Sequence, residues 1–114
     1  MKTQRFFIIA LFFLFAGTLM ATSPKKVELK LDRETGALTV TVVHPSKNME
    51  RHYIDEIVVE VNGTEVILEE YEEQEAKKEF QAIFVLKDLE KGDKIKVIAK
   101  CNQFGRKSEK LTVE

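Results

Sequence analysis

The stretch IDEIVVEVNGTEVIL, residues 54–68, carries the strongest indication of the fold. Its first half alternates apolar and polar residues, so that every second side chain from Ile57 to Val61 falls on one face of an extended chain. The dipeptide Asn62-Gly63 follows, and it favours the two-residue turn of a β-hairpin. The residues after it, TEVIL, form a return strand. The stretch therefore predicts two antiparallel strands joined by a tight turn.

The same period of two continues on both sides of this hairpin. VELKL and ALTVTVV precede it, separated by the turn DRETG, and EFQAIFVL, the turn EKGD, KIKVIAKC and KSEKLTV follow it. Short runs with turn residues between them are typical of all-β domains. The sequence predicts an all-β fold, an immunoglobulin-like antiparallel β-sandwich of about seven strands within residues 25–114. The cysteine pair and the Trp of true immunoglobulin domains are absent, so the prediction concerns architecture alone.

The first twenty-odd residues differ in composition from the rest. MKTQRFFIIALFFLFAGTLMATS places Lys2 and Arg5 before an uncharged apolar run, Phe6 to Ala16, which gives way to small residues. This layout is typical of a secretory signal peptide, which we expect to span residues 1–21. The alternative is an uncleaved membrane anchor, since the apolar segment is only a little shorter than the ~20 residues that cross a bilayer. We expect an exported protein, periplasmic or extracellular, with no membrane association after cleavage.

Charge and cysteine content exclude several classes of function. Without residues 1–21 the chain has 16 Lys and Arg against 19 Asp and Glu, a net charge of about −3, and it lacks the basic stripe expected for nucleic acid. Phosphate loops, paired-cysteine motifs and the G-x-S-x-G sequence are absent from it. A single Cys cannot form an internal disulfide in an oxidising compartment, so Cys101 needs another explanation.

One stretch, EEYEEQEAKKE at residues 69–79, departs from the strand pattern. It contains six Glu and two Lys around one Tyr. Runs of like charge repel and remain in water, so we expect a solvated loop or a frayed edge. A loop that docks a partner or binds a cation is the alternative.

Three side chains could ligate a metal: His44, His52 and Cys101. His44 follows an apolar strand that Pro45 terminates, and His52 opens the next strand, so the two rings can converge. Cys101 keeps the parity of the inward residues of KIKVIAKC, which is also typical of an inert core thiol, but the turn residues of CNQFG place it at the rim of the sheet. Two imidazoles and a thiolate suit iron, copper or zinc. A His at a strand end can equally be a half-exposed polar residue without a ligand.

VVHPSKNMERHYIDEIVVEVNG, followed by GDKIKVIAKCNQFG, resembles the iron-binding domain of the desulfoferrodoxin and superoxide reductase family. The most specific matches are His44-Pro45, His52-Tyr53-Ile54 and Cys101-Asn102 with Gly105. The resemblance implies an immunoglobulin-like sandwich in which His44 and His52 are equatorial iron ligands. It makes Cys101 the axial thiolate, opposite an open position for superoxide. It further implies a superoxide reductase-like oxidoreductase served by an electron donor protein.

The sequence also departs from that family. The family's centre has four His and one Cys, whereas the chain contains two His in all. Phe104 stands where the family has the His of CN-x-HG, and the family's upstream Lys-His-Val-Pro segment has no counterpart. A complete five-ligand centre therefore cannot form within one chain, although a homo-oligomer could supply ligands in trans. A reduced site would bind iron, zinc, or copper with Met49 as a weak further ligand.

A second and more distant resemblance is to the Z subunit of the bacterial thiosulfate-oxidation carrier complex, which binds no iron. VNGTEVI, EKGDKIKV and KSEKLTV carry this resemblance, whereas the CN-x-x-G piece favours the first family. It implies the alternative function, a non-catalytic sandwich that has lost the iron centre and works as a carrier or binding module with a partner protein. In that case the ring of Phe104 would help to seal the vacated pocket.

Overall fold

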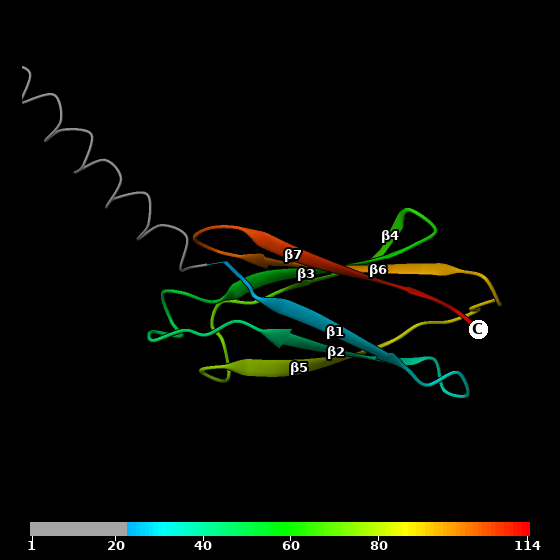
Figure 1. Cartoon of the computed structure of the whole chain (residues 1–114), viewed down its shortest axis with the longest axis horizontal. Coiled ribbons are helices and arrows are strands. Elements are labelled where there is room, and N and C mark those ends of the chain that lie inside the picture. The colour runs from blue at the N-terminus through cyan, green and yellow to red at the C-terminus, as the bar shows by residue number, and fades with distance from the viewer. Residues whose placement is uncertain (1–22) are drawn as a thin grey trace, which may run out of the picture.

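A computed structural model describes residues 23–114, and the predicted all-β fold is confirmed (Figure 1). The strands are β1 (Lys26–Leu31), β2 (Ala37–Val43), β3 (Ile54–Val61), β4 (Thr64–Glu70), β5 (Glu79–Val85), β6 (Lys94–Cys101) and β7 (Arg106–Thr112). They form two antiparallel sheets of order β1-β2-β5 and β4-β3-β6-β7. The expected signal peptide, residues 1–21, lies outside the described residues. Within residues 23–114 we find no helix long and apolar enough to cross a membrane.

The core lies between the two sheets and is built from the inward residues that the alternation predicts. In β2 the buried side chains are Leu38, Val40 and Val42, and β3 and β6 contribute their own alternating sets from the opposite sheet. The buried apolar cluster comprises Val27, Leu38, Val40, Val42, Ile54, Ile57, Val59, Phe84, Leu86, Ile95, Val97, Ala99, Cys101 and Val113. Fully burying one such aliphatic side chain contributes about 1.5–3 kcal/mol, so this layer is the main stabilising element.

The hairpin predicted at Asn62-Gly63 is confirmed. Asn62 has φ 52° and Gly63 has φ 82°, and the strands on either side of the turn pair from Val61 and Thr64 onward. Left-handed backbone at both central residues matches the right-handed twist of the strands. Two hydrogen bonds lower the pKa of Asp93. The backbone N–H of Glu90 donates to its carboxylate, and so does the Asn62 amide, at 3.0 Å.

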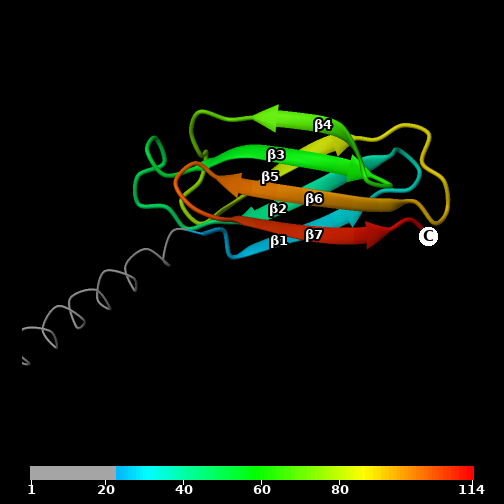
Figure 2. The ribbon, with the colours of Figure 1, turned by 90° about the horizontal axis from the view of Figure 1, so that it is seen from above.

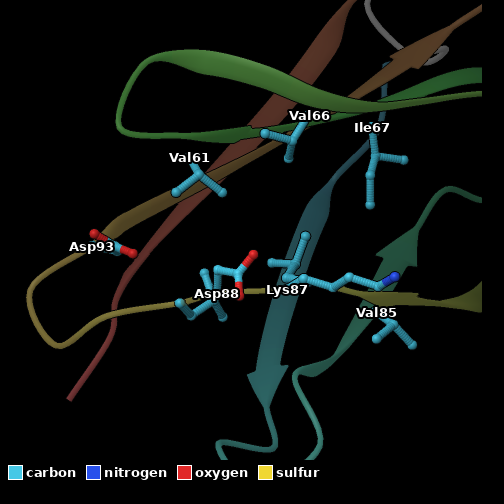
Figure 3. Close-up of a pocket in the computed structure, with 9 residues that line it drawn as sticks. Val61, Val66, Ile67, Val85, Lys87, Asp88 and Asp93 are labelled. Atoms are coloured by element: carbon cyan, nitrogen blue, oxygen red, sulfur yellow. The ribbon is translucent and has the colours of Figure 1, made fainter.

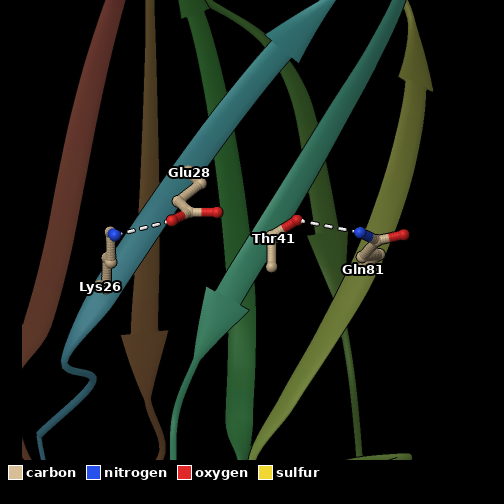
Figure 4. A network of polar contacts seen from close by, with 4 residues as sticks. All are labelled: Lys26, Glu28, Thr41 and Gln81. Carbon is tan, nitrogen blue, oxygen red and sulfur yellow. Dashed lines mark hydrogen bonds and ion pairs between the residues drawn. The ribbon is translucent and has the colours of Figure 1, made fainter.

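The outer face of the β1-β2-β5 sheet carries polar side chains together with the exposed Ile83 and Val85 of β5. Lys26 and Glu28 of β1 form an ion pair at 2.7 Å, and Gln81 of β5 donates a hydrogen bond to Thr41 of β2 at 3.2 Å (Figure 4). Lys26, Glu28 and Gln81 are exposed and Thr41 is half-buried, so water screens these interactions and they contribute little to stability. Gln81 is therefore a suitable surface position for control substitutions.

Three strands bring the predicted ligands to one end of the sandwich. Because β2 and β6 end there and β3 begins there, positions 44, 52 and 101 all lie at this end (left in Figures 1 and 2). The opposite end carries the Asn62-Gly63 turn and the loop from β5 to β6. We call these two regions the ligand end and the hairpin end.

Candidate metal centre

The structure brings His44, His52 and Cys101 together. One ligand atom from each residue lies within 4.8 Å of those from the other two. His44 is 0% exposed, Cys101 is 3% exposed and His52 is half-buried. The two imidazoles meet edge to face, with ring centroids 4.5 Å apart and an interplanar angle of 71°. The predicted convergence of the two His at the ends of one loop is thus observed.

His44 is the first residue after β2, and its position is fixed by the backbone. Its N–H donates to the carbonyl of Lys78 at 2.9 Å, which joins it to the segment that enters β5. On the side-chain face, Nδ1 lies 2.7 Å from Oε1 of Gln74. Pro45 follows, so the strand ladder ends here, as the sequence predicts. The ring is thereby held inside the protein at the end of a strand.

Gln74 is a residue of the site that the sequence analysis missed. It lies in the stretch expected to be a solvated loop. The Glu and Lys residues of that stretch are indeed exposed, and Tyr71 and Ala76 are half-buried. Gln74 itself is 4% exposed. The only signal in the sequence is that this residue is uncharged in a run of charged ones, and that signal is weak.

The loop before β3 orients His52. The backbone N–H groups of Arg51 and His52 both donate to the carbonyl of Asn48, which closes a tight turn. The hydroxyl of Ser46 donates to the His52 carbonyl at 2.5 Å, and the Ser46 N–H donates to the backbone carbonyl of Lys77 at 2.7 Å. Ser46 is 6% exposed, so this link is buried. The loop is therefore a fixed element, and it holds His52 above the strand ends.

Cys101 is the last residue of β6, and both sequence interpretations describe part of its position. It stands at the end of the strand, as the turn residues predict, yet its thiol is buried and packs with the core cluster. The Gln103 N–H points at Sγ from 3.4 Å. A hydrogen bond to sulfur stabilises a thiolate and tunes a metal that it binds.

Asn102 connects the cysteine turn to the histidine loop. Its Oδ1 accepts the Tyr53 N–H at 3.0 Å, and its Nδ2 donates to the Arg51 carbonyl at 2.9 Å. Its backbone N–H donates to the Tyr53 carbonyl at 3.0 Å. The residues on either side of His52 are thus bonded to the residue next to Cys101, which fixes the spacing of these two ligands.

The pairing of β3 with β6 is irregular beside the site. Ile54 pairs with Cys101 and Glu56 with Lys100, so Asp55 is an extra residue in β3. Such bulges bend a strand and redirect its side chains, and they occur often next to functional sites. Here the bulge lies where β3 leaves the loop that carries His52.

A hollow of about 540 Å³ opens beside His52. It is lined by Pro45, Ser46, Lys47, Asn48, His52, Lys77 and Lys78. Since His44 and Cys101 are buried, the His52 side is the face from which a small molecule can reach the cluster. Three Lys side chains give this approach a positive charge that favours small anions.

Phe104 does not seal the site. A ring that fills a vacated pocket would be buried, whereas Phe104 is 55% exposed. The expectation that its ring fills a vacated ligand pocket is therefore wrong. A phenyl ring also has no donor atom, so position 104 contributes no ligand.

The donor set fits a transition metal. Zinc bonds of about 2.0–2.1 Å to imidazole and 2.3 Å to thiolate, in tetrahedral geometry, place two donors of one ion about 3.3–3.6 Å apart. The donor atoms here lie within 4.8 Å of one another, so side-chain rotations that bring them roughly 1 Å closer would reach this range. The cluster could therefore hold a metal ion, with positions left for water or a substrate.

Comparison of the sequence with models of known protein families and with curated proteins finds no match.

Proposed function

We propose that this chain is an exported metal-binding domain in which His44, His52 and Cys101 hold one transition-metal ion. One observation carries the proposal. The two His lie at the ends of one loop and the single Cys is about fifty residues further along the chain, yet the ligand atoms of all three lie within 4.8 Å of one another. The strand ends bring the three positions to one end of the sandwich, and the side chains there converge with their donor atoms on one point.

Iron is the metal proposed first, because the family that the sequence resembles binds iron with imidazoles and one thiolate. Copper and zinc are the alternatives, since two His and one Cys also suit them. Water or a ligand from a second copy would complete the coordination. With three protein ligands the affinity is expected to be lower than that of a five-ligand centre.

The proposed activity is reduction of superoxide. Bound ferrous iron would supply the one electron that, with two protons from solvent, converts superoxide to hydrogen peroxide, and a donor protein would return the electron. The residues of the chain have two tasks. Gln103 donates its N–H to the thiolate ligand, and Lys47, Lys77 and Lys78 line the hollow beside His52, where their charge favours an anion.

The test is an anaerobic titration of the purified protein with ferrous iron, followed by oxidation. A thiolate-to-iron charge-transfer band is expected, and Cys101→Ser is expected to abolish it because a hydroxyl does not replace the thiolate. Ala99→Ser is the matched control, since it places a hydroxyl on the same buried face of β6 two residues away. It is expected to keep the band. A wild-type protein that shows no band and retains no metal by elemental analysis would contradict the proposal.

The second candidate is a non-catalytic carrier or binding module. The observation in its favour is the exposed ring of Phe104 at the position where the resembled family has a ligand. Pulse radiolysis separates the two candidates. Iron-loaded protein that consumes superoxide faster than free iron supports the reductase, whereas protein that keeps its metal without consuming superoxide supports the binding module.

A further inference from the structure

Four polar contacts hold the side chain of Gln74. Its Oε1 lies 2.7 Å from Nδ1 of His44 and 3.3 Å from the backbone nitrogen of Ile54. Its Nε2 lies 2.8 Å from the carbonyl oxygen of His44 and 2.7 Å from that of Ala76. The side chain is 4% exposed, so water does not compete with these contacts.

The backbone groups around Gln74 determine which way its amide points. The two carbonyl oxygens of His44 and Ala76 can only accept, so the atom facing them must be the NH₂ group. The N–H of Ile54 can only donate, so the atom facing it must be the amide oxygen. The amide oxygen is therefore the atom that faces His44. Nδ1 of His44 must then be the donor of the 2.7 Å bond.

We propose that Gln74 is the positioning residue of this site: it holds a proton on Nδ1 of His44 and so directs Nε2 toward the metal. A neutral imidazole with its hydrogen on Nδ1 has its lone pair on Nε2, which is the atom that coordinates. Metal-binding His residues commonly donate their other N–H to a fixed acceptor of this kind. This inference rests on the proposed function, because it assigns an orienting partner to one of the three ligands.

Gln74 also connects the segments that carry the other two ligands. Its backbone N–H donates to the Met49 carbonyl, at 3.0 Å, in the loop that leads to His52. Its Oε1 accepts from Ile54, which pairs with Cys101 in the sheet. Through this one residue, the loop between β4 and β5 is hydrogen-bonded to His44 and to the segments that carry His52 and Cys101.

Two substitutions of similar size separate positioning from simple attachment of the loop. Gln74→Glu and Gln74→Met both remove the NH₂ group that donates to the two carbonyls. Only the Glu side chain keeps an oxygen that can accept from Nδ1. The Glu variant also sets a carboxylate against the two carbonyl oxygens, so retained metal binding in this variant would be all the more telling.

The measurement is a titration of the purified full chain with Co²⁺, followed by the thiolate-to-cobalt absorption. Gln74→Met is expected to weaken Co²⁺ binding by about 10- to 100-fold, and Gln74→Glu by less than about threefold. Gln81→Met is the matched control, since Gln81 is exposed on β5 and donates a hydrogen bond to Thr41, away from the ligand residues (Figure 4). It is expected to bind like the wild type. Equal losses in the Glu and Met variants would overturn the proposal.

A second experiment locates the proton on the His44 ring by NMR. Spectra of the metal-free chain in mildly alkaline buffer would correlate the ring nitrogens with the carbon-bound ring protons. The pattern of an Nδ1-bound proton is expected, and an Nε2-bound proton would overturn the proposal. This experiment needs no metal and no variant. If the wild type binds neither Co²⁺ nor iron, the proposed metal site fails, and the NMR pattern still decides whether Gln74 fixes the ring.

Discussion

At the ligand end of the sandwich, side chains from distant parts of the sequence tie three loops together. Asn102 bonds the cysteine turn to the loop of His52, and Gln74 bonds the loop between β4 and β5 to His44. At the hairpin end, neighbouring turns are also bonded to one another, since the Asn62 amide donates to the Asp93 carboxylate at 3.0 Å. Asp32 closes its own turn by accepting the backbone N–H of Glu34 at 2.9 Å. The difference is that the bonds at the hairpin end position neither His nor Cys.

The hairpin end also has a hollow, of about 290 Å³, between the edges of the two sheets (Figure 3). Its lining includes Val61, Val66 and Ile67, with Lys87, Asp88 and Asp93 around them. All His and Cys residues of the chain lie at the other end. A hollow alone therefore does not indicate a functional site in this protein. The donor atoms and the buried bonds that orient them distinguish the ligand end.

The largest effect on stability is expected at the hairpin end, from Gly36→Ala. Gly36 has φ 77°, and an added Cβ would overlap the backbone carbonyl of Leu86, which cannot move aside. We expect the free energy of unfolding to fall by about 3 kcal/mol or more. Gly63→Ala is the control: its φ is 82°, but no atom lies within 4 Å of the added carbon, so about 1 kcal/mol is expected. Urea unfolding measures both values, and equal losses would contradict the steric argument.

A pair of Asn substitutions tests the contrast between the ends directly. Asn102→Ala removes three side-chain hydrogen bonds at the ligand end, one of them a long contact of 3.9 Å from the Cys101 thiol. Asn62→Gly removes two at the hairpin end while keeping the left-handed turn. Each is expected to lower the free energy of unfolding by about 1–2 kcal/mol. Only Asn102→Ala is expected to weaken Co²⁺ binding, by about tenfold, because it loosens the spacing of two ligands.

The same titration identifies the result that would remove the contrast. If Asn62→Gly weakens Co²⁺ binding as much as Asn102→Ala, then general stability governs metal binding and the bonds at the ligand end have no special part. Circular dichroism of both variants before the titration confirms that each is folded.

The fold could be predicted from the sequence because its signals are local. Alternating apolar residues identify the inward face of each strand, and Asn62-Gly63 specifies its own turn through two left-handed residues. About seven strands follow from this pattern, and residues 23–114 form seven. Which of the two sheets each strand joins, and in what order, depends on pairings between distant segments, which local patterns do not encode.

The candidate site was predictable only in part. His44, His52 and Cys101 could be named because two His and one Cys are the chain's only strong candidates for soft and borderline ligands. Gln74 could not, because its role depends on contacts with His44 and Ile54, made by a loop whose charge indicates solvent exposure. The exposure of Phe104 was likewise hidden, because an apolar residue in a short turn gives no sign of its direction.

The smallest expected effect concerns Tyr71, where the loop that carries Gln74 begins. Partial burial of the ring, together with the charges of Glu69 and Glu75, raises the pKa of Tyr71 from 10.0 to about 12. The folded chain therefore keeps the phenol protonated where the unfolded chain releases the proton. This contribution to stability is complete below pH 10 and is lost as the pH rises through about 12.

Water reaches the half-buried ring and screens the charges, so the loss is expected to be on the order of 1 kcal/mol. Tyr71→Phe keeps the edge-to-face contact with Phe80, whose ring centroid lies 6.1 Å away, and removes the titrating group. Thermal unfolding from neutral pH to about pH 12 is expected to show a shallower alkaline decline in Tyr71→Phe than in the wild type. Tyr53→Phe serves as the control and is expected to retain the wild-type decline. Should Tyr71→Phe decline as steeply as the wild type, the loop at the ligand end would be more open to water than its bonds to Asp55 and Met49 indicate.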